Sequence, residues 1–212
     1  MSKSLRWAVA VAAMTMIVPS VAAAQNFYAA IRGGPGWTSS TDSGPVGFED
    51  KTEFKTGFTG GGAFGYAFSF GLRAEGEMAF LYVPLKSEGG VNVDGSVKNY
   101  LLMANAYYDL KIAALGPVKP YIGFGLGAAR VNDDHEVFID SLGIKDDVDK
   151  WRTAFAYQAR VGVTYDVNKL LDLSIGYRYV HIDGGEQTNR GMTINIGGTN
   201  NHSLELGVAF KF

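Results

Sequence analysis

Apolar and polar residues alternate along several short stretches of this chain. In residues 202–212, one apolar residue falls at every second position: Leu204, Leu206, Val208, Phe210 and Phe212. An extended strand would place these residues on one face and the small or charged residues between them on the other. The stretch therefore predicts a strand with one apolar face. A soluble sheet can give the same pattern, so the rest of the chain must show whether the strand lies in a soluble or a membrane protein.

Seven further segments show the same period of two. The eight predicted strands are Phe27–Trp37, Phe54–Phe68, Leu72–Val83, Val97–Lys111, Val118–Val131, Trp151–Asp166, Leu171–Ile182 and His202–Phe212. Each is as long as, or slightly longer than, the roughly 9–11 tilted residues with which a β-strand crosses a bilayer. Glycine, asparagine or aspartate residues interrupt the pattern between most of them, as expected for turns.

The links between these segments alternate in length. Short links lie at residues 69–71, 112–117 and 167–170, and long polar links lie at residues 38–53, 84–96, 132–150 and 183–201. Short turns at one end, long loops at the other and an even number of strands are typical of an outer-membrane barrel. We therefore predict an all-β fold, an eight-stranded antiparallel up-and-down transmembrane β-barrel. Ten strands would require a hairpin within residues 132–150, and the acidic residues there argue against it.

The rows of residues that would face lipid carry no charge. On four strands these rows take every second residue of 58–68, 100–110, 155–165 and 171–179. An Arg or Lys that faces lipid at the bilayer midplane costs about 2–4 kcal/mol, which accounts for the absence of charge. Aromatic residues lie mostly near the ends of the rows, where they form girdles at the two membrane interfaces.

Charged residues fall instead on the inward rows, at similar distances from the short turns. We predict one interior polar layer made of Arg32, Glu77, Asn105, Arg160, Arg178 and Glu205. Small inward residues such as Gly61 and Gly125 leave room for these side chains, because an eight-stranded barrel is only wide enough to be filled by its own side chains. A second layer nearer the short turns would join Arg73, Asp109, Asp172 and Lys211. We expect a polar interior that is plugged.

The N-terminal residues have the parts of a secretory signal peptide. Two basic residues precede an apolar run at positions 7–18, and small residues follow up to Ala24. The run is too short to span a membrane, and alanines lie where signal peptidase cuts. We predict a signal peptide at residues 1–24 and an outer-membrane β-barrel domain at residues 25–212.

Composition excludes several classes of protein. Cleavage would remove two of the 19 basic residues and none of the 21 acidic residues, which moves the formal charge from −2 to −4 and gives no sign of nucleic acid binding. The chain has no cysteine, which excludes disulfides, zinc–thiolate sites and a cysteine nucleophile. After the signal peptide, no segment reaches the roughly 20 apolar residues of a membrane helix. The 28 glycines, 11 tyrosines and 13 phenylalanines suit strands with tight turns.

The signal peptide, the eight alternating strands and the terminal sequence LELGVAFKF resemble the small porin-family outer-membrane proteins of Gram-negative bacteria. This group has an outer-membrane protein A-like transmembrane domain and includes surface antigens. Residues 161–182, VGVTYDVNKLLDLSIGYRYVHI, are similar to that family's last two strands before the final loop. The resemblance implies an outer-membrane location. It also implies that the C-terminal row Leu204, Leu206, Val208, Phe210 and Phe212 is the signal read by the barrel-assembly machinery.

The acidic residues of 132–150 are the first remaining candidate for chemistry. The stretch contains seven acidic residues, whose oxygens are the ligands that calcium prefers. Their spacing matches no calcium loop, and runs of charge are usually solvated. We therefore predict a solvated loop without a metal.

The histidines are the second candidate. Outer-membrane lipid deacylases use a His, a Ser and a Glu near the outer rim, and His181 and Glu186 are present here. Asp183 stands where the resemblance to that family implies the serine. His202 and Ser203 are adjacent in a strand, so their side chains point to opposite faces. We predict no catalytic site, no cofactor and no enzyme activity.

These observations favour a structural and surface-antigen protein that contributes to envelope integrity, with adhesion as a further role. A narrow porin for small ions and solutes is the alternative, and a lipid-modifying enzyme is a weaker one. The expected partners are outer-membrane lipid, lipopolysaccharide and the barrel-assembly machinery. We expect a monomer that binds no nucleic acid.

Overall fold

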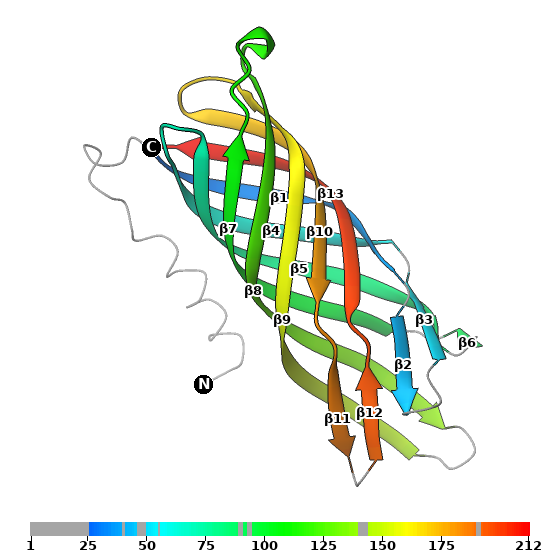
Figure 1. Cartoon of the computed structure of the whole chain (residues 1–212). Coiled ribbons are helices and arrows are strands. Elements are labelled where there is room, and N and C mark those ends of the chain that lie inside the picture. Colours follow the sequence, from blue (N-terminus) through cyan, green and yellow to red (C-terminus); the bar gives the residue numbers. More distant parts are fainter. Residues whose placement is uncertain are drawn as a thin grey trace, which may run out of the picture.

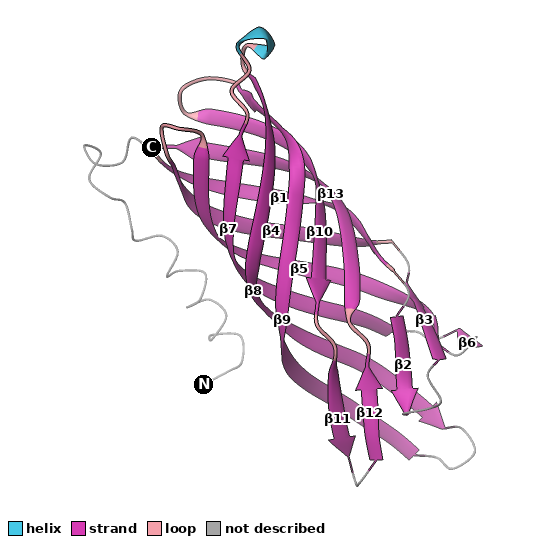
Figure 2. Ribbon diagram, in the orientation of Figure 1, coloured by secondary structure: helices cyan, strands magenta, loops and turns pink. Residues whose placement is uncertain are grey.

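The computed structural model describes residues 26–39, 41–45, 50–54, 56–88, 91–92, 95–139, 144–189 and 192–212. The predicted signal peptide, residues 1–24, lies outside this set. Within it, no helix is both long and apolar enough to cross a membrane. Nearly all of the described chain is strand, and its one helical element is the short 3-10 turn η2, Ala113–Leu115 (Figure 2).

Eight long antiparallel strands form a closed barrel (Figure 1). They are β1 (Phe27–Thr38), β4 (Gly57–Ala67), β5 (Leu72–Glu88), β7 (Gly95–Asp109), β8 (Val118–Ile139), β9 (Ile144–Asp166), β10 (Leu171–Ile182) and β13 (Thr199–Lys211). Each strand pairs with its two neighbours in the ring, and β1 pairs with both β4 and β13. The first and last strands therefore close the barrel, and the predicted eight-stranded up-and-down fold is confirmed.

The two ends of the barrel differ. One end, which we name the turn end, carries the short links between β4 and β5, β7 and β8, and β9 and β10, together with residues 26 and 212. The other end, which we name the hairpin end, carries β2 (Thr41–Pro45), β3 (Asp50–Phe54), β6 (Val91–Asn92), β11 (Gly185–Asn189) and β12 (Met192–Ile196). Figure 1 shows the turn end at the top and the hairpin end at the bottom.

The links predicted as long loops contain regular strand, which corrects the sequence reading. Residues 132–139 and 144–150 are extensions of β8 and β9, which stay paired as far as Ile139 and Ile144. Antiparallel strands tolerate polar, solvated faces, so a polar sequence can continue the hydrogen-bonded ladder. The extension adds length to two existing strands, so the ring keeps eight members. Phe54, placed by the sequence in the second barrel strand, belongs to β3 instead.

A small second sheet lies at the hairpin end. Its order is β11, β12, β2, β3 and β5, with β6 paired to the end of β5. β12 pairs with β2, so a segment near the start of the barrel is hydrogen-bonded to one near its close. The barrel wall thus continues beyond the membrane-spanning part as hydrogen-bonded strands.

The outward rows expose large apolar side chains around the whole ring. Leu102 is 63% exposed, Ile175 is 52% exposed and Leu206 is 67% exposed, although each lies at the middle of a strand. A soluble protein rarely exposes such a continuous apolar surface. A lipid bilayer is the solvent that suits it.

Aromatic residues gather at both ends of this apolar surface. Near the turn end, Phe27 and Phe64 stack at 5.5 Å between ring centroids, and Tyr66 contacts both Phe27 and Phe68. Near the hairpin end, the aromatic residues of the outward rows include Trp37, Phe80, Tyr82, Tyr100, Phe155, Tyr157, Tyr177 and Tyr179. The two groups match the interfacial girdles of an outer-membrane barrel.

Glycines on β8 fit the neighbouring side chains closely. A Cβ atom added at Gly123 would overlap the ring of Tyr107, and one at Gly125 would overlap the side chain of Asn105. Gly76 is different, because it points outward and no atom of the described chain lies within 4 Å of the position of its added Cβ. The inward glycines therefore make room for larger residues on the adjacent strand.

We expect Gly123→Ala to lower the free energy of unfolding by about 1–3 kcal/mol, because its methyl group must displace Tyr107. Gly76→Ala is the matched control, and we expect it to change this free energy by less than about 0.5 kcal/mol. Urea unfolding in lipid vesicles, followed by tryptophan fluorescence, measures both. Equal unfolding midpoints for the two variants would contradict the close fit.

Candidate functional site

Four charged side chains meet near the middle of the barrel, and we name them the central cluster: Glu77 on β5, Arg160 on β9, Arg178 on β10 and Glu205 on β13. Arg160 Nη2 lies 2.9 Å from Glu77 Oε1 and 3.1 Å from Glu205 Oε2. Arg178 Nη1 lies 3.2 Å from Glu205 Oε1 and 3.6 Å from Glu77 Oε1. No side chain of the cluster is more than 5% exposed.

Two amide side chains complete the central cluster. Asn105 Nδ2 and Gln158 Nε2 both donate to Glu77 Oε2, at 2.8 and 2.9 Å. Gln158 Oε1 accepts a hydrogen bond from Arg178 Nε at 2.7 Å. Five of the six residues predicted for the interior layer are therefore in contact. Gln158 was missed, although its place on the inward row of β9, two residues from Arg160, was a usable signal.

A second cluster lies toward the turn end and contains Arg32, Arg73, Glu75 and Asp109. Arg32 holds Glu75 through two hydrogen bonds of 2.7 and 2.9 Å. Arg73 holds Asp109 in the same two-point manner, at 2.8 and 2.9 Å, and lies 3.3 Å from Glu75 Oε1. Paired bonds of this kind fix the guanidinium and carboxylate planes together.

Aromatic side chains surround the second cluster. Tyr28 donates its hydroxyl hydrogen bond to Glu75 Oε1 at 2.5 Å. The guanidinium of Arg73 lies over the rings of Tyr107 and Tyr121, at 4.8 and 5.4 Å from their centroids. The ring faces add a favourable cation–π interaction in a site that has little contact with water.

Arg32 corrects the sequence reading, which placed it in the central layer. The structure pairs it with Glu75, a residue that the sequence reading missed, in the second cluster. Counting residues from the short turns does not give a common height, because the strands of an eight-stranded barrel are tilted and staggered. Glu75 was detectable, since it lies two residues before Glu77 on the same inward row.

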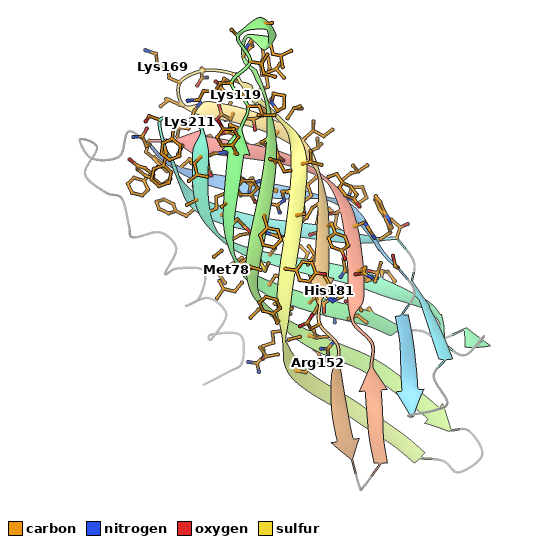
Figure 3. All side chains as sticks on the ribbon, in the orientation of Figure 1. Met78, Lys119, Arg152, Lys169, His181 and Lys211 are labelled. Carbon is orange, nitrogen blue, oxygen red and sulfur yellow. The ribbon has the colours of Figure 1, made fainter. Side chains whose placement is uncertain are left out.

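A third cluster lies at the turn end: Lys119, Asp166, Asp172 and Lys211. Lys211 Nζ lies 2.6 Å from Asp172 and 3.8 Å from Asp166, and Lys119 pairs with Asp166. These four side chains line a cavity of about 120 Å³ together with Arg73 and Asp109. The predicted second layer is therefore split, with Arg73 and Asp109 in one cluster and Asp172 and Lys211 in another. Figure 3 shows Lys119 and Lys211 together at this end.

The hairpin half of the interior is largely apolar, which the sequence reading did not predict. Buried residues from five neighbouring strands form one cluster: Ala79, Leu81, Leu101, Met103, Ala129, Val131, Ala154, Ala156, Val180 and Ile182. They follow the central cluster on the same inward rows. On these five strands the interior therefore changes from charged near the middle to mainly apolar toward the hairpin end, where Thr59, Asn99 and Asn201 are buried polar residues.

The two described histidines on the outward face form an aromatic and polar patch near the hairpin end. His181 Nδ1 lies 2.7 Å from Asn200 Oδ1, and its ring stacks on Tyr157. Its Nε2 lies 3.3 Å from Asp183, as the spacing of the two residues suggests. The side chain of Glu186 lies outside the residues whose side chains are described. His181 thus has the contacts of a residue anchored in an interfacial girdle.

His202 has a different set of contacts. Its Nδ1 lies 2.5 Å from the Tyr177 hydroxyl, and its Nε2 lies 3.4 Å from Ser39 Oγ. Ser203 is buried on the inward face, where its hydroxyl donates to Glu205. The Ser39 amide donates to Asn200 O at 2.9 Å, which ties the end of β1 to β13. His202 therefore contacts Ser39 and not its neighbour in the sequence, Ser203.

Metal binding has no support in the described side chains. Among them, no group of three His, Cys, Asp or Glu residues is placed to hold an ion. The acidic side chains at 133–150 lie outside that set, so the expectation of a metal-free stretch there remains a prediction.

Comparison with known proteins agrees with this fold. A family model described as "Outer membrane protein beta-barrel domain" matches residues 8–212. A protein of Gluconacetobacter diazotrophicus named "Outer membrane protein" is 31% identical over 163 residues, which cover 73% of this chain and 42% of the relative. An uncharacterised protein of Brucella abortus is 43% identical over 89 residues, which cover 39% of this chain and 30% of the relative. The chain therefore spans less than half the length of these curated relatives.

Solved structures share the architecture. Neisserial surface protein A aligns with a TM-score of 0.56 and 24% identity, covering 88% of this chain and 97% of that protein. OprG from Pseudomonas aeruginosa aligns with a TM-score of 0.55 and 15% identity, covering 89% and 97%. At these identities the likeness concerns the fold. Together with the match over residues 8–212, it establishes that this chain belongs to the outer membrane protein beta-barrel domain family and is located in the outer membrane.

Proposed function

We propose that this protein is a structural component of the outer membrane that contributes to envelope integrity and presents a surface antigen. The observation that carries the proposal is the filled interior. The central cluster crosses the barrel from β5 to β13, and the apolar cluster follows it toward the hairpin end. Eight-stranded barrels are filled by side chains in just this way, and their role then lies in their surfaces.

The charge balance of the interior supports a plug. Each of the three clusters contains two positive and two negative side chains, so each is neutral. An ion that passes through the barrel would have to displace a side chain of the central cluster. Each of these side chains is paired and at most 5% exposed. Breaking a buried pair leaves a charge without its partner, which costs about 3–5 kcal/mol.

The orientation of the barrel follows from its two ends. Outer-membrane barrels carry short turns on the periplasmic side and longer connections outside. We therefore assign the turn end to the periplasm and the hairpin end to the cell surface. The sheet of β11, β12, β2 and β3 would then be the antigenic surface, with adhesion through it as a further role.

A narrow porin is the alternative, and one observation favours it. The cavity of about 120 Å³ inside the turn end is lined by charged residues and has room for several water molecules. Conduction would also require a path through the central cluster and past the apolar cluster. The filled interior therefore supports the structural role over the porin.

Assembly of the barrel depends, we propose, on the C-terminal row Leu204, Leu206, Val208, Phe210 and Phe212, which the barrel-assembly machinery would read. Leu204, Leu206, Phe210 and Phe212 are each at least 50% exposed on the lipid face. Phe212 also closes the seam, because its backbone amide donates to Phe27 O at 2.9 Å. Most of the row therefore lies on the outer surface of the barrel, where a partner can contact it. We propose that the folded barrel is a monomer surrounded by outer-membrane lipid and lipopolysaccharide.

In planar bilayers, we expect the refolded protein to show no stable open conductance level, because its interior is filled. Heat-modifiable migration on a gel is the control that the sample is folded. Discrete, long-lived current steps from a folded sample would overturn the structural proposal in favour of the porin.

We expect Glu77→Ala and Arg160→Ala each to lower the free energy of unfolding by about 3–5 kcal/mol, because each leaves buried charges without a partner. The double variant should lose less than the sum of the two single losses, because the residues act as a pair. Asp183→Ala is the control: its side chain is 50% exposed, and we expect a loss of less than about 1 kcal/mol. Strict additivity in urea unfolding would show that the pair is not coupled.

We expect Phe212→Ala to reduce the amount of protein assembled in the outer membrane of living cells while leaving refolding in detergent unchanged. The substitution keeps the backbone hydrogen bond to Phe27 and removes only the side chain. Phe68→Ala is the matched control, since Phe68 is a lipid-facing residue at the same end of the barrel. Equal assembly of the two variants, measured by membrane fractionation, would argue against a C-terminal signal.

A further inference from the structure

Two positive charges stand on the outward face of the barrel, where the other described residues of the strands are uncharged. Among the described side chains of the eight barrel strands, Lys98 on β7 and Arg130 on β8 are the only Lys, Arg, Asp or Glu residues on the outward face. The alternation of burial fixes their direction. Asn99 is buried next to Lys98, and Ala129 and Val131 are buried on either side of Arg130.

The two cations lie near each other on adjacent strands. Tyr100 is opposite Arg130, and Asn132 is opposite Lys98, so the two cations are diagonal neighbours on one face of the β7–β8 pair. Diagonal neighbours are about 7–8 Å apart, within the reach of long side chains. One group of atoms outside the barrel can therefore contact both.

Hydroxyl groups surround this pair. Tyr82 is opposite Lys98 on β5, and Thr153 is opposite Arg130 on β9. Tyr82 and Tyr100 are each more than 40% exposed, and Thr153 is also exposed. We name Tyr82, Lys98, Tyr100, Arg130 and Thr153 the cationic patch. Its tyrosines belong to the aromatic girdle of the hairpin end, so the patch lies at the level of lipid headgroups.

The position of the patch indicates what it contacts. A cation on the lipid face is unfavourable at the bilayer midplane and becomes tolerable near the interface, where headgroups and water reach it. The girdle at the turn end has no matching cation among its described outward residues. Among the described outward rows of the barrel strands, the positive charge therefore lies at the hairpin end, which the orientation proposed above places at the cell surface.

The chemistry of the patch suits a phosphate group. The planar guanidinium of an arginine matches two oxygens of a phosphate, and a lysine adds a second point of positive charge. Tyrosine and threonine hydroxyls donate further hydrogen bonds to the same kind of oxygen. A zwitterionic headgroup would offer these two cations no net charge, whereas an anionic phosphorylated headgroup would.

We propose that the cationic patch binds a phosphorylated, anionic lipid of the outer leaflet, with the lipid phosphate between Lys98 and Arg130 and the acyl chains along the apolar rows below. The site would attach a specific lipid to the β5–β9 side of the barrel. This role goes beyond the structural function proposed above and does not depend on whether the interior conducts.

Native mass spectrometry of the refolded protein in detergent tests the site, with bisphosphorylated lipid A as the probe. We expect Lys98→Gln with Arg130→Gln to weaken binding roughly ten- to thirty-fold, because two attractive charges are lost. The control is Lys111→Gln with Lys169→Gln, which removes two positive charges from exposed residues at the turn end and should leave binding unchanged. Figure 3 shows Lys169 at that end.

Two further probes identify the ligand. Lipid A without phosphates should bind the wild-type protein as weakly as bisphosphorylated lipid A binds the double variant. Inorganic phosphate alone should not bind. The single variants Lys98→Gln and Arg130→Gln should each give part of the loss, and they replace the double variant if it does not refold.

Three results would overturn the proposal. If the Lys98 and Arg130 variants bind bisphosphorylated lipid A as tightly as the wild type does, these two residues are not part of a lipid-binding site. An equal loss of lipid A binding in the turn-end control would show that the overall charge of the protein, and not the cationic patch, determines binding. Equal binding of phosphate-free lipid A, or retention of inorganic phosphate by the same two residues, would exclude the phosphorylated lipid as the ligand.

Discussion

Closure of the backbone hydrogen-bond ladder is the constraint on which this structure depends. In hydrocarbon there is no water to satisfy amide and carbonyl groups, so a strand that spans a membrane needs a partner on both sides. The pairing of β1 with β13 supplies the last of these partners along nine residue pairs, from Tyr28 and Lys211 to Thr38 and Asn201. Without that seam, two strand edges would face lipid. The apolar exterior can face lipid only because the closed ring pairs the backbone groups behind it.

A ring of eight strands leaves little room, and the interior reflects this. Long side chains from some strands occupy the space left by glycines on others, as Tyr107 does beside Gly123. The charges of the central cluster have almost no contact with water, and all three clusters are neutral groups of four, each with two arginines or lysines and two carboxylates. Pairing offsets the cost of burying these charges, whereas the apolar side chains in the other half are buried without such a cost.

The period of two in the sequence predicted the strands, their number, their direction and the face of most residues, because side chains alternate strictly along a strand. It did not predict which inward residues meet. Arg32 reaches Glu75 and not the central cluster, since contact inside the barrel depends on tilt, stagger and side-chain length. It also did not predict the pairing of β2 with β12, which depends on strands far apart in the chain. β2 carries no apolar row that marks it as a strand, whereas Met192, Ile194 and Ile196 of β12 alternate with polar residues and indicate an extended segment.

The pairing of β12 with β2 has a consequence for recognition at the hairpin end. Residues 43–45 lie beside residues 194–196, so two parts of the chain separated by almost the whole barrel form one continuous surface. A molecule that reads this surface meets an epitope assembled only by folding. A synthetic peptide copied from either segment carries half of that epitope, so antisera raised against such a peptide are not directed at the assembled surface.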